Sequence, residues 1–154
     1  MAPSTTSMNV SLLIGRLLVA ALFLPFGLNA IMNFQSTVNY VTSNHIPFPQ
    51  LDAAIAIVFE VGFAALLLVG YKTRWAALAL ILFVLVVSFL FHHFWDMPAA
   101  QVLAQQTNFF KNMAIAGGLF AFFAVGAGDW SVDAKLGEGL TSPMGGIGSR
   151  TQVS

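Results

Sequence analysis

Five ionisable side chains fall within or at the ends of long apolar runs of this 154-residue chain: Arg16, Glu60, His92, His93 and Lys111. The chain has only six Lys and Arg residues and six Asp and Glu residues in all. A charge inside a membrane-spanning segment is costly, so such a position marks a structural pair or a site that handles protons, ions or ligands. These five residues are the first candidates for chemistry.

Arg16, Glu60 and Lys111 could form a buried polar network with Asn112. Glu60 lies near the middle of its apolar run, Arg16 about 9 Å inside one end of its own run, and Lys111 near the opposite end. We expect an Arg16–Glu60 ion pair that Lys111 approaches from the other side. Two interpretations stay open: the pair only holds helix register, because losing one partner leaves a bare buried charge, or the network lines a polar pocket or proton path.

The segment from Phe91 to Asp96 holds the densest group of chemical side chains. On a helix, His92 and Asp96 would share a face, as would His93 and Asp96. A metal site would need a third ligand, and only His45 offers another imidazole, so we expect no metal. The chain has no cysteine, which excludes disulfides, thiol exchange and cysteine-ligated iron–sulfur clusters.

Aromatic rings surround these polar groups at what we expect to be one depth. The ligand-binding candidates there are His92, His93, Trp95, Asp96 and Asn108, and the rings are those of Phe89, Phe91, Phe94, Trp95, Phe109 and Phe110. Such surroundings suit a flat ligand such as a quinone, or a lipid headgroup. In the alternative interpretation, Trp95 and the histidines are interfacial residues at headgroup level.

The segments that must position these groups are membrane helices. The chain is 58% hydrophobic and 8% charged, with a mean hydropathy of +0.82, which exceeds what a small soluble domain could bury. Four runs, about residues 10–31, 53–70, 75–94 and 107–126, have the roughly 17 to 25 residues that a crossing requires. They lack the period-2 alternation of a transmembrane barrel. The sequence therefore predicts an all-α integral membrane four-helix bundle.

Three of the helices are predicted to turn an ionisable group and small residues to the same side, as a bundle interior requires. The expected faces are Arg16, Ala20, Phe23, Gly27 and Ala30; Ala53, Ala56, Glu60, Ala64 and Leu67; and Asn108, Lys111, Ile115, Gly118 and Phe122. Small faces such as Gly117-Gly118 could drive association into a homo-oligomer as readily as internal packing.

Basic residues lie on one side of the predicted membrane only. Lys72 and Arg74 fall in the turn between the second and third helices, and Lys135 and Arg150 follow the fourth. The positive-inside rule then places both termini in the cytoplasm. We expect a polar N-terminal tail over residues 1–9 and a flexible cytoplasmic tail over 127–154. A cleavable signal peptide is the alternative for the first run, but that run is too long and lacks a basic start.

Several function classes are disfavoured. The formal net charge is zero, so the chain has no electrostatic footprint for nucleic acid. It has no Ser-His-Asp arrangement, phosphate-binding loop or complete metal motif. We do not expect an enzyme that acts alone, and any redox role must use a bound cofactor or a partner subunit.

Five short motifs in a fixed order resemble the DoxX family of small four-helix membrane proteins, over roughly residues 12–133. They are Gly15-Arg16-Leu17-Leu18 with Phe26-Gly27-Leu28; Phe59-Glu60-Val61-Gly62; Tyr71-Lys72-Thr73-Arg74-Trp75-Ala76-Ala77; Phe91-His92-His93-Phe94-Trp95; and Asn108-Phe109-Phe110-Lys111-Asn112-Met113-Ala114. Many relatives have Gly-x-x-Lys at the end of the first helix, where this chain has Ala30.

The resemblance implies a bacterial inner membrane location and an association with membrane oxidoreductase assemblies. We therefore expect a membrane subunit that binds a quinone or similar small molecule while a partner protein supplies the redox centres. The alternative is a non-catalytic accessory or assembly subunit of a larger membrane complex. A solute or proton path through the bundle ranks last, because large aromatic side chains leave little room for a pore.

Overall fold

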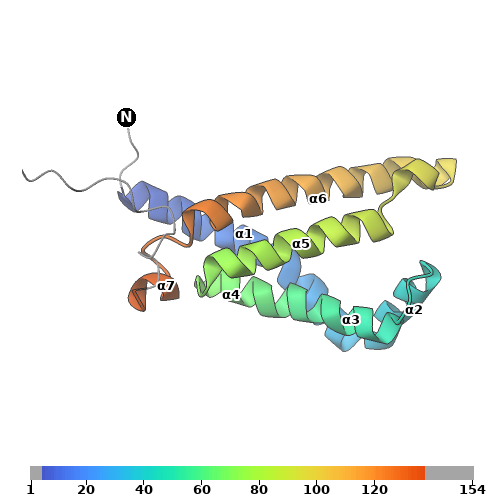
Figure 1. Ribbon diagram of the computed structural model, residues 1–154, viewed down its shortest axis with the longest axis horizontal. Helices are drawn as coiled ribbons and strands as arrows, with labels where there is room; N and C mark the ends of the chain where they lie inside the picture. The colour runs from blue at the N-terminus through green and yellow to red at the C-terminus, as the bar shows by residue number, and fades with distance from the viewer. Residues whose placement is uncertain (1–4, 138–154) are drawn as a thin grey trace, which may run out of the picture.

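Four long apolar helices make up the computed structural model, which describes residues 5–137 (Figure 1). The first is α1, Thr5–Met32. The second begins as α3, Pro49–Ile57, passes through a π-helical segment η1, Val58–Phe63, and ends as α4, Ala64–Val69. The third and fourth are α5, Thr73–Phe91, and α6, Ala99–Val125. Three short helices complete the fold: α2, Phe34–Ser43, the 3-10 turn η2, Phe94–Asp96, and α7, Val132–Lys135.

These helices confirm the predicted all-α membrane bundle. Four spans, Thr5–Met32, Pro49–Val69, Thr73–Asp96 and Ala99–Val125, are long and apolar enough to cross a membrane. The last helix starts at Ala99 rather than near residue 107. Its first turns are rich in glutamine, so they do not belong to the apolar run from which the start was predicted. Hydropathy locates the apolar part of a helix and misses polar turns that extend it.

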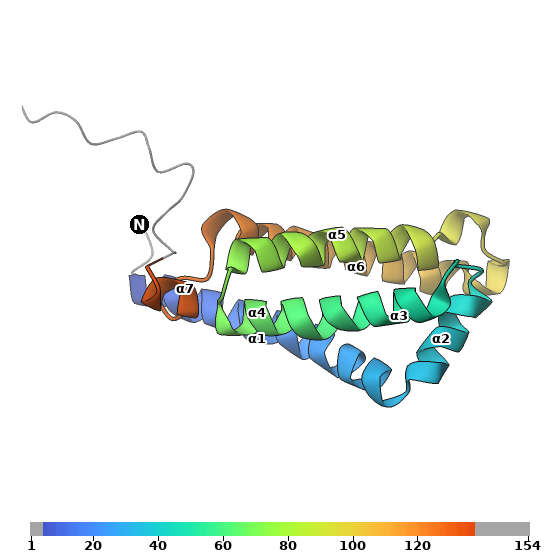
Figure 2. The same cartoon turned by 60° about the horizontal axis from the view of Figure 1, so that its bottom comes forward.

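Different short elements lie at the two ends of the bundle (Figure 1 and Figure 2). At one end, α7 lies beside the start of α1 and the α4–α5 turn. We name it the basic end, because Lys72 and Arg74 stand at the start of α5 and Lys135 ends α7. At the other end lie α2 and the α5–α6 connection; we name it the aromatic end. Toward the aromatic end, α1 and the α5–α6 pair lie farther apart than at the basic end.

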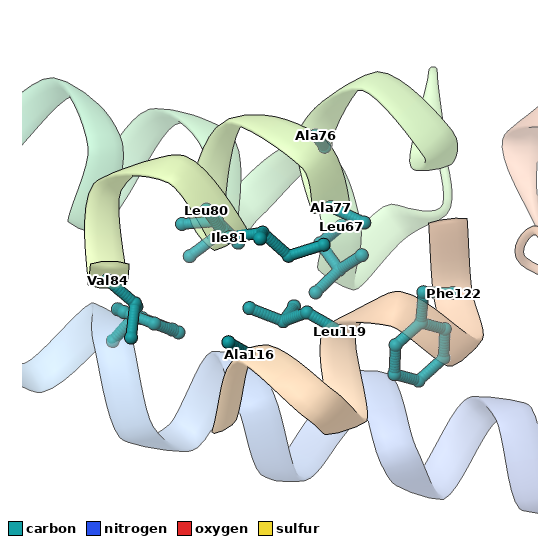
Figure 3. Close-up of a cluster of buried hydrophobic side chains, with 11 residues drawn as sticks. Leu67, Ala76, Ala77, Leu80, Ile81, Val84, Ala116, Leu119 and Phe122 are labelled. Atoms are coloured by element: carbon teal, nitrogen blue, oxygen red, sulfur yellow. The ribbon is translucent and has the colours of Figure 1, made fainter. Parts of the chain in front are cut away.

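The buried apolar core lies toward the basic end. Leu67 of α4, Leu80 of α5 and Leu119 of α6 are completely buried and meet in its centre (Figure 3). Helix α1 reaches α6 here too, since a Cβ added to Gly15 would lie only 2.7 Å from Cζ of Phe122. The helices are therefore held together most firmly at the basic end.

Residues 127–137 are not the free tail that the sequence predicts. Ala127 is 4% exposed and Ser131 is 5% exposed, and α7 follows, with the Ser131 hydroxyl accepting a hydrogen bond from the Ala134 amide at 3.2 Å. The predicted N-terminal tail differs likewise, because α1 already begins at Thr5. The remainder of the predicted C-terminal tail, 138–154, lies outside the described residues.

The first connection at the aromatic end contains a helix that the sequence analysis missed. Helix α2 buries Val38 and Val41 and packs against α3 and α1. The Tyr40 ring stacks on Phe91 at the end of α5, with centroids 5.6 Å apart. Helix α2 therefore covers the aromatic end of the bundle instead of forming an open loop.

Candidate functional site

The Arg16 side chain is a structural tie at the basic end. It is 1% exposed, and its guanidinium donates from Nη2 to the Trp130 carbonyl at 2.6 Å and from Nη1 to the Leu68 carbonyl at 3.3 Å. The Asp133 carboxylate lies near enough to attract it. One side chain thus joins α1, the end of α4 and the chain that follows α6.

Asp133 caps the start of α5 from a distant part of the sequence. Its carboxylate accepts hydrogen bonds from the Lys72 amide at 2.7 Å and the Thr73 amide at 3.0 Å, and its own amide donates to the Gly70 carbonyl at 2.8 Å. Gly70 has a φ of +70°, and an added Cβ would overlap the guanidinium packed against it. The turn therefore requires glycine for both its backbone conformation and the close packing.

Asn9 and Asp129 form a second tie between α1 and the same segment. The Asn9 amide donates to Asp129 Oδ2 at 2.9 Å, and the Asp129 backbone amide donates to Asn9 Oδ1 at 3.0 Å. We name residues 127–135 the strap, because these bonds fasten them across the basic end. The hydrogen bond from Arg16 to the Trp130 carbonyl of the strap gives this buried charge a structural role.

Glu60 has no such partner. It lies within the π-helical segment η1, where a Cβ added to Gly27 of α1 would lie 2.9 Å from the Glu60 Cβ. Within residues 5–137 its carboxylate makes no hydrogen bond or ion pair, so the expected Arg16–Glu60 pair is not formed. A π-helical segment often marks a functional position in a helix, and an unpaired carboxylate deep in a membrane helix does the same.

Asn112 is the buried polar residue of α6. The inward face of α6 consists of Asn112, Ala116, Leu119 and Phe122. The expected face with Lys111 and Gly118 is therefore wrong by about one position, since both of these are exposed. Asn112 is 9% exposed as a residue, and its side chain makes no hydrogen bond in the part of the chain that the structure describes.

Glu60 and Asn112 lie at similar depths. The ring of Phe59, the residue before Glu60, stacks on the ring of Phe83 in α5, with centroids 5.1 Å apart. In the antiparallel α5–α6 pair, His92 Nδ1 lies 2.7 Å from Gln105 Oε1, which sets the register. Counting 1.5 Å per residue from that bond places Phe83 and Asn112 within about 5 Å of each other along the bundle.

Lys111 points away from the bundle interior. Its side chain is exposed, and Nζ donates to Asn108 Oδ1 at 2.9 Å, one turn nearer the aromatic end. A long basic side chain that reaches toward the membrane surface in this way lowers the cost of its position. Lys111 therefore contacts neither Glu60 nor Asn112 through a hydrogen bond within the described range 5–137.

The two histidines leave the helix before they can share a helical face with Asp96. Helix α5 ends at Phe91, so His92 and His93 lie in the connection to η2. His92 bonds to Gln105 of α6, a partner that sequence reasoning missed, and His93 Nε2 lies 3.5 Å from Asp96 Oδ1. Among the residues with described placement, no group of three His, Asp or Glu side chains could hold a metal ion.

The aromatic rings gather as expected, apart from Phe91. Trp95 lies between Phe94 and Phe109, with ring centroids at 5.4 and 5.8 Å, and Phe89 packs edge-on against Phe109 at 5.4 Å. Phe110 contacts Phe94 at 6.0 Å. The rings mainly pack against one another, and a flat ligand would have to lie beside this cluster rather than replace its interior.

The strap residues are the ones that sequence reasoning missed most clearly. The Asp129-Trp130-Ser131-Val132-Asp133 segment looks like the polar start of a tail, and its only local signal is Ser131 as a helix N-cap. Partners that lie 60 or more positions away, such as Asp133 with Thr73, leave no pattern in a single sequence.

Comparison with known proteins agrees with this architecture. The DoxX family model matches residues 11–93. The Escherichia coli K12 inner membrane protein YphA is 39% identical over 82% of this chain and 90% of its own length, and the inner membrane protein YqjF of the same strain is 30% identical over 83% and 93%.

A more distant relative and the solved structures add less. The Surfeit locus protein 4 homolog of Schizosaccharomyces pombe is 30% identical over 51% of this chain but only 26% of its own length. No solved structure matches. The four membrane spans and the two Escherichia coli relatives identify a bacterial inner membrane protein, and the chain belongs to the DoxX family.

Proposed function

We propose that this chain is a membrane subunit of an oxidoreductase system that binds an apolar small molecule with a polar head, of the quinone class. The site lies between the core and the aromatic end, and a partner protein supplies the redox centres. The observation that supports it is the Glu60 carboxylate, placed in a π-helical segment deep in its span without a hydrogen-bond partner among residues 5–137. Glu60 is half-buried, and a carboxylate within a membrane-spanning helix normally has a polar partner, so the lack of one among the described residues suggests a missing ligand.

The polar contacts come from two elements. Glu60 on η1 and Asn112 on α6 lie at similar depths, and an amide and a carboxylic acid together offer both donors and acceptors to a carbonyl or hydroxyl head. Trp95 and the rings around it would contact the apolar body of the ligand.

Native mass spectrometry of gently extracted protein tests this proposal. We expect a stoichiometric quinone-class ligand on the wild-type protein and its loss in Glu60→Gln and in Asn112→Leu. Lys111→Gln is the matched control, because it removes a charge from the same half of the bundle but from the outward side. Wild-type protein that carries no such ligand, or equal loss in the control, would contradict the proposal.

A second candidate function is that of a non-catalytic accessory or assembly subunit. The observation that favours it is the outward side of α6, where a Cβ added to Gly117 or Gly118 would meet nothing within 4 Å. Small residues on an open membrane-helix face allow close approach of another helix. A protein partner in fixed stoichiometry that is lost in Gly118→Leu, with no small ligand present, would favour this function.

A further inference from the structure

We propose that the basic end of the bundle binds the headgroup phosphate of an anionic phospholipid through Arg74 and Lys135, beside the exposed rings of Trp75 and Trp130. This inference concerns the opposite end of the molecule from the proposed quinone site and stands independently of it.

The fold brings the two cations to one end. Arg74 lies in the first turn of α5 and Lys135 ends α7. Because the Asp133 carboxylate accepts hydrogen bonds from the Lys72 and Thr73 amides, α7 is fixed against the start of α5 (Figure 1). Two basic residues from distant parts of the sequence therefore lie at the same end of the bundle.

Neither cation has a hydrogen-bond or ion-pair partner among residues 5–137. Arg74 is half-exposed and Lys135 is exposed. A guanidinium has five N–H donors in a planar fork that suits a phosphate, and an ammonium adds a point charge. The pair can therefore donate to a phosphate without first breaking a hydrogen bond or ion pair to any residue from 5 to 137.

The carboxylates of the nearby acidic residues accept hydrogen bonds from other groups of the protein. Both carboxylate oxygens of Asp133 accept backbone amides of the α4–α5 turn, and Asp129 Oδ2 accepts the Asn9 amide. Hydrogen bonds of this kind spread the negative charge over fixed donors. Asp129 remains exposed, but its carboxylate shares its charge with the Asn9 amide, and Arg74 and Lys135 attract an approaching phosphate.

The tryptophans indicate that this surface lies at the level of the lipid headgroups. The Trp75 side chain is 70% exposed and that of Trp130 is 50% exposed. Indole rings at a helix end favour the interface between water and hydrocarbon. If the phosphate belongs to a phospholipid, the acyl chains of that lipid can lie along the exposed apolar residues of α5. This favours a phospholipid over a free phosphate ion.

Native mass spectrometry in detergent, with phosphatidylglycerol or phosphatidylcholine of the same acyl chains added, measures the preference directly. A basic residue near a charged membrane surface contributes enough that Arg74→Gln or Lys135→Gln should each lower the phosphatidylglycerol preference about fivefold. The double variant should lower it about 25-fold. Arg74→Lys, which keeps the charge and loses the fork, should fall between wild type and Arg74→Gln.

Three controls make the test decisive. Lys111→Gln removes one charge at the aromatic end and should change the preference less than twofold. Inorganic phosphate should not displace the bound lipid, and circular dichroism should show unchanged helix content in every variant. An unchanged preference in the double variant, an equal loss in Lys111→Gln, or displacement by inorganic phosphate would each overturn the proposal. Lys135→Gln decides the matter if Arg74→Gln loses helix content, because Lys135 is exposed.

Discussion

Replacing Arg16 with glutamine should unfold the basic end of the bundle more readily. The substitution removes two charge-assisted hydrogen bonds, to the Trp130 and Leu68 carbonyls. At about 1.5 to 3 kcal/mol each, their loss should lower the free energy of unfolding by about 3 to 6 kcal/mol. That is a large share of the stability of a small protein, so a visible shift of the unfolding midpoint is expected.

Unfolding in mixed micelles with increasing sodium dodecyl sulfate, followed by tryptophan fluorescence, measures this change. Trp130 lies on the strap and should report its release. Arg16→Lys is the matched variant, because it keeps the charge but loses the planar fork that reaches both carbonyls. Its free energy of unfolding should fall by about half as much as that of Arg16→Gln.

A double-mutant cycle separates the strap from the ion pair that the sequence predicted. Arg16→Gln combined with Asp133→Asn should be non-additive, because both residues fasten the same segment. Arg16→Gln combined with Glu60→Gln should be additive within about 0.5 kcal/mol, because the two side chains form no bond. Strong coupling of Arg16 to Glu60, or no loss of stability in Arg16→Gln, would refute the reasoning.

Three further predictions concern the turn, the helix contact and the orientation. Gly70→Ala should cost at least about 1 to 3 kcal/mol in unfolding free energy, since it places a Cβ at positive φ and against the buried guanidinium; a neutral effect in the same assay would contradict the turn geometry. Gly27→Leu should lower the unfolding midpoint, because a Cβ there would already lie 2.6 Å from Val61 Cγ2, whereas leucine at the open position Gly117 should not. In this cysteine-free chain, a single cysteine at Gln101 should react with an impermeant maleimide in intact cells, and one at Lys135 only after lysis; the reverse pattern would invert the predicted topology.

The fold could be predicted well from the sequence, because hydrocarbon imposes strict demands on a chain. Every backbone polar group in a membrane needs an internal partner, so apolar runs of spanning length must be helices. Burial then follows from small residues at helical spacing: the face of Arg16, Ala20, Phe23, Gly27 and Ala30 on α1 is buried throughout. On α6 the prediction failed by about one position, because Lys111 and Asn112 are adjacent and hydropathy cannot tell which of them turns inward.

The candidate site was only partly predictable. Composition marks Arg16 and Glu60 as costly residues, but it does not say what each one contacts. The predicted pairing assumed that opposite charges deep in a bundle must meet. Backbone carbonyls can accept from a guanidinium equally well, and here the end of α4 and the strap accept from Nη1 and Nη2 of Arg16, while its Nε has no partner among the described residues.

The sequence by itself determined the membrane location, the four spans, the family and the short set of polar residues worth testing, because these depend on local composition and order. Only the tertiary structure decided that Arg16 fastens the strap, that Asp133 caps α5, and that Glu60 lies in a π-helical segment without a partner among residues 5–137. These facts depend on which distant backbone groups remain free once the helices have packed. That is a property of the assembled bundle and not of any one segment.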